Sequence, residues 1–113
     1  MDCIFCKIIS GEIKANLLYQ DKDVIALDDI NPTAPHHKLI IPRRHIATIN
    51  DLTIADTSLI GHMVLVAKQI AKENGMAEPG YRLVFNCNSG GGQAVFHIHL
   101  HLIGGRPMNW PPG

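Results

Sequence analysis

The segment that most constrains this chain is the run His-Ile-His-Leu-His-Leu-Ile at residues 97–103, where histidine and aliphatic side chains alternate. Successive side chains of a β-strand point to opposite faces of the sheet. A strand here would therefore present His97, His99 and His101 on one face and aliphatic residues, which need a core to cover them, on the other. A solvent-facing edge strand is the plainer alternative, but such strands normally carry Thr, Lys, Glu or Ser. The run predicts a half-buried strand whose histidine face serves a ligand.

The remaining pattern predicts an α+β fold with a five-stranded antiparallel sheet, one long helix and a short N-terminal helix. Besides the histidine strand, we expect short strands at residues 17–20, 24–27, 37–41 and 81–86, and the short helix at residues 4–9. The long helix follows a capping-box-like Thr-Ile-Ala-Asp at residues 53–56 and ends near Asn74-Gly75. Its buried face, packed on the sheet, is expected to contain Leu59, Ile60, Met63, Val64, Ala67, Ile70 and Ala71.

Length and composition restrict the class of protein. The chain has 113 residues, of which 46% are hydrophobic and 18% charged, and this suits one globular domain over residues 1–113. Ten basic residues balance ten acidic ones, so neither nucleic-acid binding nor electrostatic attachment to a membrane is expected. We expect no signal peptide, because Ser10-Gly11 cuts short the first apolar run. The odd number of cysteines, three, favours a reducing, cytoplasmic location.

A glycine-rich segment, Ser-Gly-Gly-Gly-Gln at residues 89–93, lies just upstream of the histidine run. Glycine lets the backbone approach a ligand closely, and its amides can face an anion. We therefore expect the amides of residues 90–93 to offset charge on a phosphate. A neutral imidazole can attack phosphorus, and neighbouring imidazoles that are cationic near neutral pH can stabilise oxygens or protonate a leaving group. His99, flanked by an imidazole on each side, is the expected nucleophile.

A catalytic metal site is the competing interpretation of the histidines, because His-X-His on a strand suits zinc. The Cα atoms of His97 and His101 would lie about 13 Å apart along a strand. One ion cannot readily bind all three histidines at the short bonds that zinc requires. A zinc hydrolase would use His97 and His99, whereas the full row fits an extended substrate better.

Together these motifs resemble those of the histidine triad superfamily. Its signature, His-φ-His-φ-His-φ-φ, occupies residues 97–103, and the Asp-Ile-Asn-Pro-Thr-Ala-Pro-His-His at 29–37, followed by Leu-Ile-Ile-Pro at 39–42, resembles its second motif. Further segments resemble the nucleotide-binding branch in particular: residues 4–9, 91–93, 104–107 and 110–113. The resemblance implies an HIT-like fold, a sheet extended by dimerisation, and hydrolysis of purine nucleoside 5′-phosphoramidates and related adenylates.

The resemblance also implies roles for individual residues. His99 would be the nucleophile on the α-phosphorus, His101 would contact phosphate oxygens and His37 would lie near the leaving group. The main-chain carbonyl of His97 would orient the His99 ring, and Asp29 would bind the ribose hydroxyls. The other residues expected around the base, ribose and phosphate are Ile4, Phe5, Ile8, Leu27, Ile30, Asn86, Gly92, Gln93 and Val95.

Ala94 departs from the family pattern, because many relatives carry Ser there, which is thought to help protonate the leaving amine. The departure affects leaving-group assistance rather than phosphate binding. It favours the alternative function, a nucleotide-binding regulatory module with weak or vestigial catalysis. His101 is retained where the uridylyltransferase branch carries Gln, and this favours hydrolysis over transfer to a second sugar phosphate.

A structural zinc ion and a homodimer complete the expectations. In some bacterial-type relatives a Cys-X-X-Cys pair, here Cys3 and Cys6, occurs with two histidines that correspond to His45 and His97. These four residues would hold zinc, with two reduced thiols on a short helix as the alternative. A five-stranded sheet with one helix leaves an edge or face exposed, so a two-fold partner is expected, with the proline-rich tail at 108–113 reaching towards the partner's active site.

Overall fold

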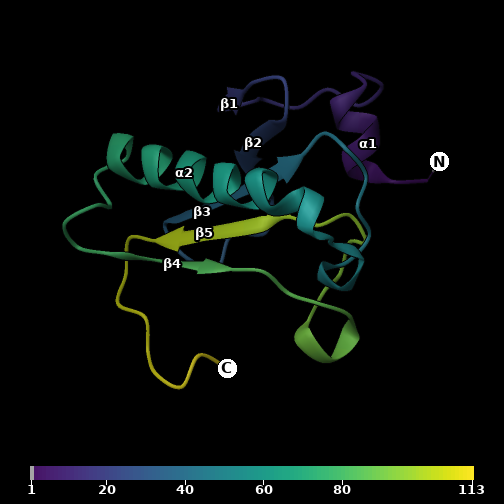
Figure 1. Cartoon of the computed structure of the whole chain (residues 1–113). Helices are drawn as coiled ribbons and strands as arrows, with labels where there is room; N and C mark the ends of the chain where they lie inside the picture. Colours follow the sequence, from purple (N-terminus) through teal and green to yellow (C-terminus); the bar gives the residue numbers. More distant parts are fainter. Residues whose placement is uncertain (1) are drawn as a thin grey trace.

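The computed structural model describes residues 2–113, which form one five-stranded antiparallel sheet with a long and a short helix (Figure 1). The strands are β1 (Tyr19–Gln20), β2 (Val24–Asp28), β3 (His36–Pro42), β4 (Tyr81–Val84) and β5 (Leu100–Gly104), in the order β1-β2-β3-β5-β4. The helices are α1 (Ile4–Ile9) and α2 (Thr57–Glu73), with short 3-10 turns at Ile49–Asp51, Ile54–Asp56 and Ser89–Gly91. The predicted α+β class and sheet are confirmed. Within residues 2–113, no helix has the length and apolar character needed to cross a membrane.

The neighbouring strands β2 and β3 are buried on both faces, and each face of the sheet has its own core. The core between the sheet and α2 contains Val24, Ala26, Ile40, Leu100 and Leu102 from the strands and Met63, Val66, Ala67 and Ile70 from the helix. The opposite core contains Ile25, Leu27, Leu39 and Ile41 from β2 and β3, together with Cys3 and Phe5 from the α1 segment. Successive side chains of β2 and β3 thus point alternately towards α2 and towards α1. The α1 face is the one that carries the site histidines described below.

One residue of the buried face of α2 differs from the prediction: Val66 belongs to this face and Val64 does not. Met63, Ala67 and Ile70 are buried as expected, but Val64 is 39% exposed and Val66 is only 5% exposed. Residues 63, 66, 67 and 70 follow the i, i+3, i+4, i+7 spacing of one helical stripe, whereas residue 64 lies a quarter-turn away from residue 63. Ahead of α2, the Thr53 amide donates to the Asp56 carboxylate at 2.8 Å, as the capping-box pattern predicts.

The histidine strand is shorter than predicted, because β5 begins only at Leu100 and leaves His97 and His99 in irregular backbone. The register pairs Ile40 with Leu100, so Pro42 would face residue 98 if the ladder continued. Proline has no amide to donate to a sheet ladder. The Ile98 amide instead donates to the Ile46 carbonyl at 2.8 Å, which draws the chain away from the sheet. The first two histidines are therefore placed by loop contacts rather than by strand alternation.

Other strand ends differ by a few residues. The strand expected at 17–20 is reduced to β1, and the one expected at 81–86 ends at Val84. In contrast, β2 and β3 extend slightly beyond the predicted limits, to Asp28 and Pro42.

Ile40 offers a test of the core beneath α2. Its side chain is fully buried among residues of β2, β5 and α2. Ile40→Ala should reduce the free energy of unfolding by about 2–5 kcal/mol, because it removes apolar contacts and leaves a cavity. Ile54→Ala, at a position that is 93% exposed, should change it by less than about 0.5 kcal/mol. Urea denaturation measures both, and equal effects would contradict the assigned packing.

Candidate active site and Cys/His cluster

The orientation of His99 is set by a main-chain carbonyl. Its Nδ1 lies 2.8 Å from the carbonyl oxygen of His97. A carbonyl oxygen only accepts hydrogen bonds, so in the neutral ring Nδ1 carries the proton and Nε2 keeps its lone pair. Nε2 is the atom that a nucleophilic imidazole must leave free. The geometry agrees with the carbonyl role that the family resemblance implies for His97.

A chain of hydrogen bonds sets the tautomers of the other two site histidines. The Thr33 amide donates to Nδ1 of His37 at 3.1 Å, so the proton of neutral His37 is on Nε2. That Nε2 lies 2.9 Å from Nδ1 of His101, which accepts the bond. Neutral His101 therefore carries its own proton on Nε2. The site combines a lone pair on His99 with an N–H donor on His101.

His101 is neutral near pH 7, contrary to the expectation of cationic neighbours for the nucleophile. Burial, followed by the imidazoles of His99 and His37, lowers its pKa from 6.5 to about 4, against a smaller opposing effect of Asp29. Any stabilisation that His101 gives to a phosphoryl oxygen is thus a hydrogen bond from a neutral ring. It does not depend on a full positive charge.

These histidines line a cavity of about 450 Å³, which we call the histidine cavity. Twelve of the predicted site residues line it: Ile4, Phe5, Ile8, Leu27, Asp29, Ile30, His37, Asn86, Gly92, Val95, His99 and His101. The sequence did not single out Asp28, Asn31, Thr33 or Leu39, which also line it. Asn31 and Thr33 lie in the segment 29–37 that resembles the family's second motif, so this motif could have identified them as lining residues. The wall is mostly apolar and includes the Phe5 ring, whose edge-on contact with His99 has a centroid distance of 5.1 Å.

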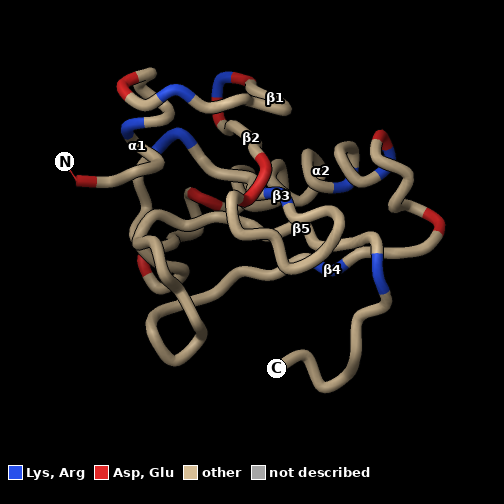
Figure 2. The backbone as a smooth tube through the Cα atoms, turned by 180° about the vertical axis from the view of Figure 1, so that it is seen from behind, with Lys and Arg blue, Asp and Glu red and all other residues tan. Residues whose placement is uncertain are grey.

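The cavity contains no Lys or Arg among its lining residues. Figure 2 shows that the segment joining β4 to β5 is also free of charged residues, in agreement with its sequence. A bound anion would therefore be met by histidine N–H groups, amides and hydroxyls. This environment suits one negative charge better than several, because each further charge would be desolvated without a cation to balance it.

Three of the four glycine-segment amides that were expected to face a phosphate, those of residues 91–93, are bonded within their own turn. The amides of Gly91, Gly92 and Gln93 all donate to main-chain carbonyls of the same turn, at 3.0–3.1 Å. The Gln93 side chain is buried outside the cavity lining, where it accepts from the Asn88 amide at 2.8 Å and donates to the Ala47 carbonyl at 2.7 Å. The structure thus places Gln93 as a support for the loop, with Gly92 on the cavity wall.

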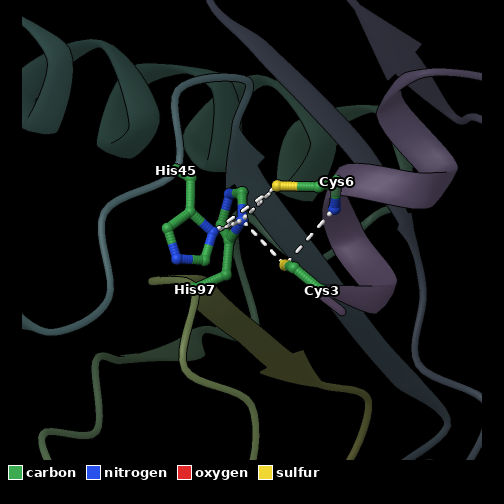
Figure 3. A group of neighbouring side chains, drawn as sticks. All are labelled: Cys3, Cys6, His45 and His97. Carbon is green, nitrogen blue, oxygen red and sulfur yellow. Dashed lines mark hydrogen bonds between the residues drawn. The ribbon is translucent and has the colours of Figure 1, made fainter. Parts of the chain in front are cut away.

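Cys3, Cys6, His45 and His97 converge behind the α1 wall of the cavity and form the Cys/His cluster (Figure 3). The Cys3 Sγ lies 3.3 Å from Nδ1 of His97, and the Cys6 Sγ lies 3.5 Å from Nδ1 of His45 and 3.6 Å from Nδ1 of His97. The two Nδ1 atoms are 3.1 Å apart. In a tetrahedral zinc site with two sulfur and two nitrogen ligands, neighbouring ligand atoms are separated by about 3.3–3.8 Å. The donor set fits a zinc ion, because the three sulfur–nitrogen distances lie within this range and the distance between the two nitrogens is only slightly shorter.

His97 has the tautomer that a metal ligand needs. Its Nε2 donates to the Pro42 carbonyl at 2.7 Å, which leaves Nδ1 unprotonated and directed at the two thiols. Burial lowers its pKa and so favours the neutral ring. A carbonyl partner on the second ring nitrogen is the usual support of a ligating histidine. In the described chain none of the cysteines forms a disulfide.

Two other arrangements of ligand atoms fit a metal less well. Asp29, His37 and His101 lie close together, but the Thr33 amide requires His37 to hold its proton on the very nitrogen that would face the ion. A zinc hydrolase on His97 and His99 was the competing prediction. The His97 ring is turned into the Cys/His cluster, whereas the His99 ring faces the histidine cavity, so the two rings do not converge on one ion.

The fold, the paired histidines and the apolar cavity together define a histidine triad (HIT) protein. Residues 2–110 match the family described as "Scavenger mRNA decapping enzyme C-term binding". The chain belongs to this HIT family.

Its relatives include a purine nucleoside phosphoramidase of Escherichia coli strain K12, which is 50% identical over 107 residues, covering 95% of this chain and 90% of the relative. The crystal structure of an HIT family hydrolase from Legionella pneumophila Philadelphia 1 superposes with a TM-score of 0.97 at 57% identity, over 99% of this chain and 100% of that one. A histidine triad protein from Clostridium difficile gives a TM-score of 0.92 at 41% identity, over 96% and 95% of the two chains.

The lowered pKa of His101 predicts a pH dependence of stability. In the unfolded chain this group takes up a proton near pH 6.5, but in the folded chain only near pH 4. The free energy of unfolding should therefore fall as the pH is lowered from about 6.5 to about 4, because the unfolded state binds more protons. His101→Gln should flatten this dependence, and His36→Gln should not. Urea titrations across this range measure it, and identical slopes for wild type and His101→Gln would contradict the assignment.

Proposed function

We propose that the chain hydrolyses the P–N bond of purine nucleoside 5′-phosphoramidates and related adenylates through a nucleotidyl intermediate on His99. The observation that carries the proposal is the pairing of a free Nε2 lone pair on His99 with a neutral N–H donor on His101 in one cavity. The activity named for the 50% identical relative supports the same reaction. The absence of Lys and Arg from the cavity lining also supports this reaction, because a phosphoramidate linkage carries only one negative charge on phosphorus.

The site residues can be assigned to two displacement steps. In the first, Nε2 of His99 attacks the α-phosphorus, the P–N bond breaks, and the leaving nitrogen takes up a proton from solvent and departs as the amine. In the second, water attacks the same phosphorus, the bond to His99 breaks, the attacking water returns a proton to solvent, and the nucleoside monophosphate leaves. His101 donates its Nε2 proton in a hydrogen bond to a phosphoryl oxygen, and donors placed in advance in this way are most effective in a water-poor site. His37 fixes the tautomer of His101 and lies on the leaving-group side.

The nucleoside is held by the other walls of the cavity. The purine packs among the aliphatic side chains and Phe5 of the α1 side, including Ile4, Ile8, Leu27 and Ile30. Asp29 binds the ribose hydroxyls through its carboxylate, which is kept in place because Oδ1 accepts from the Asn31 amide at 2.8 Å. Asn86, Gly92 and Val95 complete the ribose and phosphate side, with Gln93 holding their loop from behind.

A regulatory nucleotide-binding module is the second candidate function, and Ala94 is the observation that favours it. Ala94 lines the histidine cavity at the position where a serine would offer a proton to the leaving amine. Tight binding of adenosine monophosphate without turnover of a phosphoramidate would support this module over the hydrolase.

His99 provides the direct test of the hydrolase. His99→Asn should keep the fold and still bind adenosine monophosphate. Turnover of adenosine 5′-phosphoramidate should fall at least about a thousandfold, equivalent to about 4 kcal/mol of transition-state stabilisation. The matched control, His36→Asn, replaces a half-buried histidine outside the cavity lining and should change turnover by less than about threefold. Normal turnover by His99→Asn would overturn the proposed mechanism.

We propose further that Cys3, Cys6, His45 and His97 hold a structural zinc ion. All four positions of a tetrahedral ion would be filled by the protein, so its role is to fix α1 against the sheet rather than to activate water. Elemental analysis of protein expressed with ample metal should find about one zinc per chain, and Cys6→Ser should lose it while Cys87→Ser keeps it. Wild-type protein without zinc would refute this proposal.

The protein is also proposed to act as a homodimer. β4 lies at one edge of the sheet with an unpaired side, and α2 presents Leu65 to solvent at 62% exposure. The C-terminal tail is bound near that edge, because Arg82 of β4 donates to the Asn109 carbonyl at 2.7 Å, and it carries Trp110 at 84% exposure. A second copy that pairs at β4 would cover this region and meet the tail.

Light scattering at micromolar concentration should give the mass of two chains. Leu65→Glu should weaken the dimer, because a charge on the apolar surface of α2 would be buried on association. Ile54→Glu, at another exposed apolar position, should leave the mass unchanged. A wild-type monomer at this concentration would contradict the dimer.

A further inference from the structure

The helix α1 contributes to two sites at once. Cys3, at its N-cap, and Cys6, within it, point into the Cys/His cluster. The intervening and following residues Ile4, Phe5 and Ile8 line the histidine cavity. A helix of only six residues is not stable by itself and takes its position from its tertiary contacts. Whatever holds the two cysteines therefore also holds one wall of the cavity.

His97 makes a second connection between the two sites. Its imidazole lies in the Cys/His cluster, while its main-chain carbonyl accepts the hydrogen bond from His99. The Phe5 ring contacts both imidazoles edge-on, with centroid distances of 5.7 Å to His97 and 5.1 Å to His99. The His97 backbone and the Phe5 ring are thus the two contacts that join the His97 side chain to the nucleophile.

A second cavity, of about 450 Å³, lies beside the histidine cavity and reaches the cluster. Its lining includes Cys3 and His45 from the cluster, and it shares Ile4, Ala94 and Val95 with the histidine cavity. These shared residues form a wall between the two cavities that is one residue thick. Two of the four cluster residues, Cys3 and His45, thus border a cavity that is separate from the histidine cavity but adjoins it.

We propose that metal binding at the Cys/His cluster and nucleotide binding in the histidine cavity are energetically coupled, with His97 and Phe5 as the positioning residues that transmit the effect. The inference rests on the proposed nucleotide and zinc sites. A bound metal fixes both cysteines and the His97 ring, and so preforms the α1 wall and the orientation of His99. Without metal, part of the nucleotide's binding free energy is used to order them. Because such coupling is reciprocal, a nucleotide must strengthen metal binding by the same factor.

Calorimetric titration of the full chain with adenosine monophosphate, in zinc-loaded and chelator-treated forms, measures one side of the coupling. The dissociation constant should be about tenfold larger without zinc. Competition with a chromophoric zinc chelator, with and without saturating adenosine monophosphate, measures the other side and should give the same factor. The ring ¹⁵N signals of His99 should show a weakened Nδ1–H hydrogen bond in the zinc-free form, which a purely global loss of stability would not produce.

His45→Ala separates metal loss from direct damage to the nucleotide site, because His45 contacts Cys6 and His97 but does not line the histidine cavity. It should weaken zinc binding and bring the nucleotide affinity of zinc-treated protein to the zinc-free value. The control His62→Ala, at a residue bonded to Asp21, should retain the zinc-dependent difference. Circular dichroism checks that each form is folded.

Nucleotide affinities that agree within twofold in the two metal states would overturn the coupling, even where turnover is normal. Failure of the zinc-free chain to fold would also overturn it, since the proposal requires a folded metal-free state. In contrast, a tenfold coupling without phosphoramidate turnover would support the coupling and refute only the hydrolase.

Discussion

The hydrogen bond from Nδ1 of His99 to the carbonyl of His97 is the interaction on which the site depends. It decides which ring nitrogen holds the proton, and so which nitrogen can attack. The bond exists because the chain leaves the sheet before Leu100 and places His97 so that its side chain and its carbonyl serve different sites. A regular strand through residues 97–99 would have turned both rings to the same face.

The rest of the fold keeps this irregular segment in place. β2 and β3 are buried on both faces, so they form a rigid platform between α2 and α1. Pro42 has two roles in placing this segment. It prevents the ladder between β3 and β5 from continuing, and its carbonyl accepts a hydrogen bond from Nε2 of His97. On the other side of the cavity, the Thr33 amide fixes His37, and His37 fixes His101. The tautomers of all three cavity histidines are thus traceable to main-chain groups.

Much of this arrangement could be predicted from the sequence, because it follows from local patterns. Alternation placed Leu100 and Leu102 opposite His101, helical spacing located most of the α2 core, and the resemblance of the motifs named most of the cavity lining. The spacing of Cys3 and Cys6 suggested a cluster that the structure brings together with His45 and His97. These features depend on neighbouring residues or on recognisable motifs.

The features that could not be predicted depend on contacts between distant segments. The end of β5 is determined by Pro42 and by the bond from Ile98 to Ile46. The lowered pKa of His101 follows from burial in the folded chain, and the inward-bonded amides of Gly91 and Gly92 follow from how their turn closes. Gln93 looked like a ligand residue because of its motif, but its partners are the Ala47 carbonyl and the Asn88 amide.

In the proposed reaction, His99 carries the nucleotidyl group during turnover. Rapid quenching of the reaction with adenosine 5′-phosphoramidate, followed by mass spectrometry of the intact chain and its peptides, tests this most directly. We expect a transient chain that is heavier by one adenylyl group, with the adduct on Nε2 of His99 in the peptide that spans the triad. An adduct on any other residue, or turnover with no adduct at any quench time, would contradict it.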